Sequence, residues 1–182
     1  MQNIYIVLSK SGTYISSMLY KATKFKYTHV SLVIDEPFRE MYSFGRRILN
    51  YPLVGGFVVE KLKGGFYDRL PETTCAVYKL TVTDEQYLHI KNTIAEFVEN
   101  YRKYKYSFIG LATIKFGIAW ERKYRFTCSQ FVAYVLKQSG IMNFNKKSSL
   151  ITPYDFYKLG LHEIFNGDLK RIYGYSTKII AS

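Results

Sequence analysis

One cysteine lies where its thiol could act as a nucleophile. Cys128 follows Thr127 in the segment Tyr124-Arg-Phe-Thr-Cys-Ser-Gln-Phe-Val132, and Thr127 has the residue type of a helix N-cap. Gln130 lies three residues after Thr127, which is the spacing of a capping box. Cys128 would then be the first residue of a helix that ends before Gly140. Its thiol would lie at the positive end of the helix dipole, where a thiolate is stabilised.

A thiol nucleophile needs a base beside it, and the base needs an orienting partner. Of the three histidines, His29 is the best candidate for the base, because it lies in the alternating, β-branched segment 28–34, which predicts a strand. A second strand is expected at 39–44, directly after a turn, so the two strands should be hairpin neighbours. Tyr42 and Glu40 are the two candidates for the orienting residue, and this pattern does not choose between them.

Each of these residues also has a purely structural interpretation. A free cysteine is often a small buried residue, and His29 could be a core histidine with satisfied hydrogen bonds. Tyr42 would then be a packing residue and Glu40 a solvated strand residue. Cys75, at the start of a strand expected at 74–82, is expected to be structural only.

The remaining pattern predicts an α+β domain with antiparallel strand pairing. Further strands are expected at 4–8 and 57–62, and helices at 13–22, at 84–104 after a Thr83/Gln86 capping box, and at 152–160. The segment 106–116 is a short helix or a packed loop. Segments 161–165 and 169–173 predict a terminal β-hairpin. No repeat or linker divides residues 1–182, so we expect one domain.

The composition favours a globular protein without cofactors. Hydrophobic residues make up 48% and charged residues 22% of 182 residues, and no apolar run approaches the length of a membrane span. The start of the chain lacks the features of a signal peptide, so a cytoplasmic protein with two reduced cysteines is expected. No metal-ligand spacing and no phosphate-binding glycine loop occurs, so neither a metal nor another cofactor is expected.

The net charge of +12 raises the question of an anionic partner. Lysines and arginines are scattered rather than clustered, so a nucleic-acid partner is not expected. Peripheral contact with an anionic membrane stays open as a weaker alternative. The oligomeric state does not follow from this sequence.

The motifs resemble those of a known enzyme family. The segment His29-Val-Ser-Leu-Val-Ile-Asp35, the following Glu40-Met-Tyr-Ser-Phe-Gly-Arg46 and the later Phe-Thr-Cys-Ser-Gln-Phe-Val are similar to the NlpC-type, papain-fold cysteine hydrolases. The histidine strand precedes the cysteine helix here, as in the circularly permuted, YiiX-like branch. The resemblance covers nearly the whole chain.

The resemblance implies a permuted papain-like fold with an antiparallel sheet packed on the cysteine helix. It also implies a thiol hydrolase or cysteine peptidase in which Cys128 is the nucleophile, His29 the base and Tyr42 or Glu40 the third residue. Ser11 and Thr13 would line the cleft and bind substrate. The substrate would be a peptide-like amide or an acyl lipid. The alternatives are a lipid acyltransferase or thioesterase, and an inactive binding module that kept the cleft.

Overall fold

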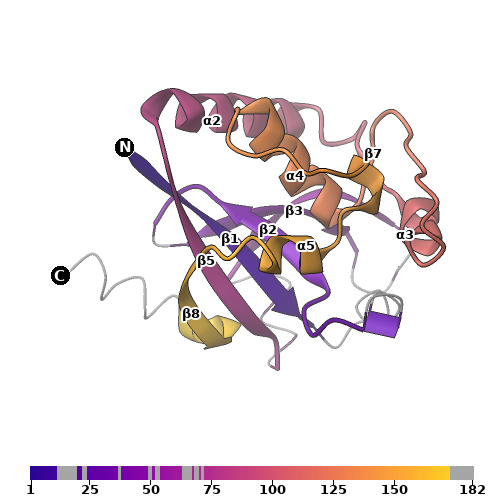
Figure 1. The fold of residues 1–182 in the computed structure, drawn as a ribbon, viewed down its shortest axis with the longest axis horizontal. Coiled ribbons are helices and arrows are strands. Elements are labelled where there is room, and N and C mark those ends of the chain that lie inside the picture. Colours follow the sequence, from indigo (N-terminus) through magenta and orange to yellow (C-terminus); the bar gives the residue numbers. More distant parts are fainter. Residues whose placement is uncertain are drawn as a thin grey trace.

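The computed structural model describes residues 1–11, 20–21, 24–36, 38–48, 51, 54–62, 67, 70 and 72–172. They form an α+β fold in which helices pack against a curled, mixed sheet (Figure 1). The strands are β1 (Gln2–Lys10), β2 (His29–Val33), β3 (Glu40–Arg46), β4 (Gly55–Lys61), β5 (Thr74–Val82), β6 (Lys105–Tyr106), β7 (Arg125–Phe126) and β8 (His162–Asp168). The helices are α2 (Asp84–Glu99), α3 (Phe108–Ile114), α4 (Cys128–Gln138) and α5 (Pro153–Tyr157), with 3₁₀ turns at Ser148–Leu150 and Leu169–Arg171.

The sheet has the order β7-β6-β4-β3-β2-β1-β5-β8. The pairs from β6 to β8 along this order are antiparallel, while β6 and β7 are parallel. The expectation of an antiparallel sheet is therefore corrected to a mixed one. The parallel pair arises because the chain leaves β6, forms α3, and returns in the same direction as β7 just before the cysteine helix.

Apolar residues are buried on both faces of this sheet. Successive side chains of a strand point to opposite faces, so Ile4, Ile6 and Leu8 of β1 join one core cluster while Tyr5 and Val7 join the other. Figure 1 shows α2 and α4 over the first face. This two-sided burial explains why β1 is a nearly continuous apolar run.

The first core holds the cysteine helix against the strand that carries His29. The ring of Phe131, in α4, packs on Phe44 of β3 and Phe97 of α2, with centroids 5.4 and 5.0 Å apart. The strands that α4 contacts most are β2 and β3. Because aromatic packing of this kind fixes the helix over these strands, the start of α4 lies at the start of β2.

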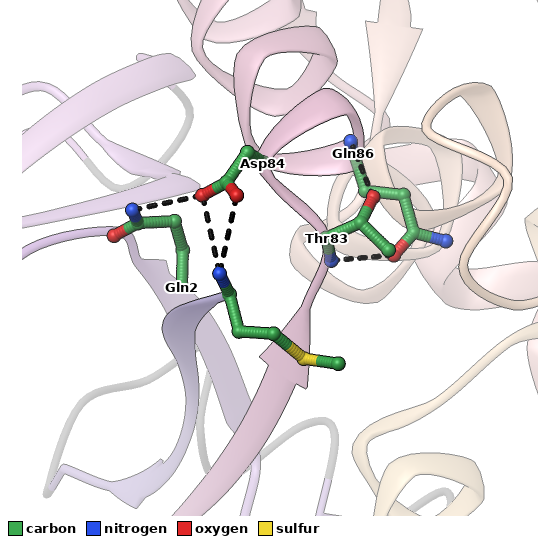
Figure 2. A network of polar contacts seen from close by, with 5 residues as sticks. Gln2, Thr83, Asp84 and Gln86 are labelled. Carbon is green, nitrogen blue, oxygen red and sulfur yellow. Dashed lines mark hydrogen bonds and ion pairs between the residues drawn. The ribbon is translucent and has the colours of Figure 1, made fainter.

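Helix α2 begins as predicted. The Thr83 hydroxyl accepts the Gln86 N–H at 3.1 Å, and the Gln86 side chain accepts the Thr83 N–H at 3.0 Å, which confirms the capping box (Figure 2). Asp84 accepts hydrogen bonds from the Gln2 side chain at 3.0 Å and from the amino group of Met1 at 3.1 Å. These contacts attach the start of β1 to the start of α2. The helix ends at Glu99, earlier than the expected 104.

The prediction of a terminal hairpin was wrong. Asn166, Gly167 and Asp168 do not form a turn, because they are paired with Ala76, Cys75 and Thr74 of β5 as part of one continuous strand, β8. The segment after β8 is a 3₁₀ turn that buries Leu169. The expected strands at 4–8, 28–34, 39–44, 57–62 and 74–82 are all present. The helix expected at 13–22 lies outside the described residues except for Tyr20 and Lys21.

None of the helices in the described ranges combines the length and apolar character that a membrane span requires.

Candidate active site

The cysteine helix is capped by Thr127. Its hydroxyl accepts the Gln130 N–H at 3.2 Å, which confirms the predicted N-cap. The capping box is not formed, because the Gln130 side chain donates to the hydroxyl of Ser148 at 3.3 Å instead. The helix is followed by Gly140 with φ of 63°, a left-handed conformation that glycine adopts easily. Cys128 is thus the first residue of α4, as predicted.

The thiol of Cys128 is buried and surrounded by polar groups. The residue is only 2% exposed. Its thiol is hydrogen-bonded with His29, and the Val30 N–H and the Ser129 side chain also contribute hydrogen bonds. The hydroxyl of Tyr106, on β6, is hydrogen-bonded to the same sulfur. The structure therefore brings the predicted Cys128 and His29 together, from the first residues of α4 and β2.

A third residue, Glu60 of β4, completes this group. Its Oε1 lies 3.0 Å from Nε2 of His29, and the two side chains are 10% and 18% exposed. Its Oε2 accepts hydrogen bonds from the hydroxyls of Ser31 at 2.7 Å and Tyr67 at 3.2 Å. Because Glu60 engages Nε2, the imidazole has Nδ1 left to face the thiol.

Neither Tyr42 nor Glu40 lies beside His29, and strand geometry gives the reason. Tyr42 pairs with Leu32, so its side chain points to the face of the sheet opposite to His29. Glu40 shares that face, and the Tyr42 hydroxyl donates to it at 3.1 Å. Glu60 pairs with Met41, which lies on the His29 face. The residue beside His29 therefore comes from β4, one strand beyond the predicted one, and from the opposite face to Tyr42 and Glu40.

One feature of the sequence indicates Glu60. It is the one acidic residue in the segment 57–62, which was expected to be a strand. If this segment pairs antiparallel with β3, then Glu60 lies beside β3, which is the strand that follows the His29 strand. Alternation along β4 then decides its face. The missing information was the register between the strands, which no local pattern supplies.

The pKa values of Cys128, His29 and Glu60 depend on one another. Burial alone would raise the pKa of the Cys128 thiol, but the hydrogen bond and the charge of His29 lower it below its usual value. Burial alone would lower the pKa of His29, yet the carboxylate of Glu60 and the sulfur of Cys128 raise it well above its usual value. Burial would also raise the pKa of Glu60, and His29 together with Ser31 lowers it. Each shift favours the charged form of its group, which is a thiolate for Cys128, an imidazolium for His29 and a carboxylate for Glu60.

The two predicted substrate-binding residues are placed only in part. Ser11 is half-buried and lies two residues beyond Ser9, which pairs with His29 across β1 and β2. Thr13 lies outside the described residues.

The site contains no evident metal ligand set. Within the part of the chain that the structure describes, no three residues among His, Cys, Asp and Glu lie close enough together to hold a metal ion. No protein-family model matches this sequence, and no curated protein and no solved structure matches it either. Any functional assignment therefore depends on the chemistry of Cys128, His29 and Glu60.

Proposed function

We propose that this protein is a cysteine hydrolase that cleaves an amide or ester bond through an acyl-enzyme on Cys128. The observation that carries the proposal is the contiguous arrangement of Cys128, His29 and Glu60, in which a buried thiol has a lowered pKa. A nucleophile, its base and an orienting group within hydrogen-bond reach are the features that nucleophilic catalysis requires.

The proposed reaction has two halves. The thiolate of Cys128 attacks the carbonyl carbon, and His29 donates its proton to the leaving amine or alcohol as that bond breaks. Water then attacks the thioester, giving one proton to His29, and the carboxylic acid leaves as the thiolate is restored beside the imidazolium. The backbone N–H of Cys128, at the start of α4, is a donor for the oxyanion.

Glu60 acts on His29 rather than on the substrate. Its carboxylate holds Nε2, which fixes the ring plane and stabilises the imidazolium that the resting state contains. Ser31 and Tyr67 in turn hold Glu60 by donating to its second oxygen. Glu60 is therefore a positioning residue in this scheme.

The order of elements supports a permuted, NlpC-type papain-like fold as part of the proposal. The strand with His29 precedes the helix with Cys128, and β3 and β4 follow that strand in the same sheet. Peptide-like amides and acyl lipids are the substrate classes that this resemblance suggests. Acyl transfer would use the same first half-reaction, with an alcohol or amine in place of water.

The pH dependence of alkylation by iodoacetamide tests the proposal. Peptide mapping by mass spectrometry follows Cys128 and Cys75 in the same sample, so Cys75 is an internal control. We expect Cys128 to react with an apparent pKa below the ordinary thiol value of about 8.5, and this pKa to rise in His29→Ala. A titration near the ordinary value that does not change in His29→Ala would exclude the catalytic pair.

A further inference from the structure

A small cavity lies beside the candidate active site, between α3 and the segment that leads into β7. Its volume is about 190 Å³, and it is lined by Ser107, Phe108, Ile109, Trp120, Arg122 and Arg125. Figure 1 shows α3 and the following chain at one end of the molecule, away from α2 and β8. Three of the residues that line the cavity are apolar or aromatic, and two are arginines.

The two arginines lie together because the chain turns tightly between them. The Arg125 N–H donates to the Arg122 carbonyl at 3.1 Å, and Tyr124, inside this turn, has a left-handed φ of 62°. Neither guanidinium forms an ion pair or hydrogen bond within the described ranges of the chain. Two adjacent cations without a counter-charge repel each other and favour an anion between them.

The nearest acidic residue along the chain does not neutralise these arginines. Glu121 accepts hydrogen bonds from the Ser148 hydroxyl at 2.8 Å and from the Ser149 N–H at 3.3 Å. Those hydrogen bonds, with that of Ser148 the largest effect, lower the pKa of Glu121. Its carboxylate is therefore committed to the 3₁₀ turn at Ser148–Leu150.

Ser107 provides a third polar group in the cavity. The residue is only 3% exposed, and its hydroxyl makes no capping hydrogen bond to α3. That leaves the hydroxyl to donate to a ligand in the cavity.

Two aromatic rings, those of Phe108 and Tyr106, connect the cavity to the thiol of Cys128. The Phe108 ring, in the cavity wall, packs 4.8 Å from the Tyr106 ring. Tyr106 is hydrogen-bonded to Cys128. It also pairs with Phe126, which lies two residues before Cys128 in the chain. A group held in the cavity would thus be held close to the reacting sulfur.

We propose that this cavity is a phosphate-binding subsite for the substrate of the proposed hydrolase. Two guanidinium forks and one hydroxyl supply more donors than the two oxygens of a carboxylate can accept, and they match a phosphate group better. The apolar wall of Phe108, Ile109 and Trp120 would contact the carbon chain next to the phosphate. The substrate class is an acyl compound with a phosphate group, either a lipid headgroup or a soluble phosphate ester.

The single tryptophan gives a direct test, since Trp120 lines the cavity. Inorganic phosphate and glycerol 3-phosphate are titrated against Cys128→Ala while Trp120 fluorescence is recorded. We expect a saturable change, and a Kd that rises at least about tenfold in Arg122→Gln/Arg125→Gln, which is the loss of about 1.4 kcal/mol. Ser107→Ala should raise Kd less. Lys123→Gln is the matched control, because Lys123 lies over the Tyr124 ring and does not line the cavity.

Vesicles of phosphatidylglycerol distinguish the two sources of phosphate. A saturable response to vesicles that depends on Arg122 and Arg125 assigns the phosphate to a lipid headgroup. Saturation by glycerol 3-phosphate alone assigns it to a soluble ester. No saturable response to any of these probes, or equal weakening in Lys123→Gln, would overturn the subsite.

This test does not depend on the proposed function. The Cys128→Ala protein has no nucleophile, so phosphate binding is measured whether or not the thiol is catalytic. Conversely, the alkylation profile of Cys128 requires neither arginine. Failure of one proposal is therefore recognised separately from failure of the other.

Discussion

The two cysteines of this protein are both buried, yet their surroundings change their acidity in opposite directions. Cys75 lies in β5 in the second core cluster, among Tyr5, Val7 and Met41. Burial, and then the charge of Asp168, raises its pKa to about 12. Cys128 is just as enclosed, but its pKa is lowered.

The difference shows that partners, and not burial, decide whether a thiol is reactive. Cys75 pairs with Ser9 and Gly167 across the neighbouring strands, and the charge of Lys26, the smallest influence on its thiol, does not offset the effect of burial. Cys128 has an imidazolium that a buried carboxylate keeps charged. The five predictions below test this comparison, from the largest expected effect to the smallest.

Substituting His29 by Ala should remove the difference between the thiols. Without the imidazolium, burial should raise the pKa of Cys128, as it does for Cys75. At pH 6, a thiol with a pKa of about 8.5 is ionised to about 0.3%, so we expect alkylation of Cys128 to fall about 100-fold. Peptide mapping after iodoacetamide treatment measures it, and Cys75 should not change. Undiminished reactivity of Cys128 would show that the helix start alone sustains the thiolate.

Substituting Glu60 by Gln should weaken the ion pair without removing it. Loss of the carboxylate lowers the pKa of His29, so less imidazolium is present to stabilise the thiolate and the apparent pKa of Cys128 rises. We expect about a tenfold loss of reactivity at pH 8, because each unit of pKa is a factor of ten. Glu40→Gln is the matched control, since Glu40 lies on the other face of β3. A larger loss in Glu40→Gln than in Glu60→Gln would restore Glu40 as the orienting residue.

The loss of stability caused by Glu60→Gln should also depend on pH. The lowered pKa of Glu60 gives stability that is present above the ordinary carboxyl range and is lost as pH falls through its folded value. The raised pKa of His29 gives stability that is complete below its ordinary value and is lost as pH rises through its folded value. Breaking a buried pair costs about 3 kcal/mol, so urea unfolding should show the largest deficit near pH 6.

Substituting Tyr106 by Phe should have a smaller effect on the thiol. The Tyr106 hydroxyl is hydrogen-bonded to the sulfur, but it carries no charge. Removing one neutral hydrogen bond, worth about 1 kcal/mol or less, should reduce alkylation of Cys128 at pH 6 by about threefold. Phe retains the packing on Phe108. A change as large as that of His29→Ala would mean that Tyr106 is itself required to form the thiolate.

Substituting Thr127 by Ala should affect stability more than reactivity. The hydroxyl caps α4 at 3.2 Å, and loss of such a cap costs about 1 kcal/mol. We expect a lower midpoint of urea unfolding and a thiol titration shifted by less than about half a unit, because His29 is the larger influence on the thiol. A shift as large as that of Glu60→Gln would assign the lowered pKa mainly to the helix start.

The sequence alone determined most of the elements and two of the site residues. Alternation and β-branched content were enough for the strands at 28–34 and 74–82, and the Thr127 cap placed Cys128 at a helix start. These features depend on neighbours within a few residues, so local physics specifies them. The pairing of Cys128 with His29 followed from the need of a thiol for a base, and the structure places the two together.

Tertiary structure decided the third residue, the sheet and the cavity. Glu60 reaches His29 only through the register of β2, β3 and β4, and a shift of one residue would have placed it on the other face. Local preference favours a turn at Asn166-Gly-Asp168, but these residues instead pair with the edge of β5 as part of a strand. Arg122, Arg125 and Ser107 meet because β6 and β7 pair in parallel. Contacts between residues far apart in the chain made each of these choices, and no local pattern encodes them.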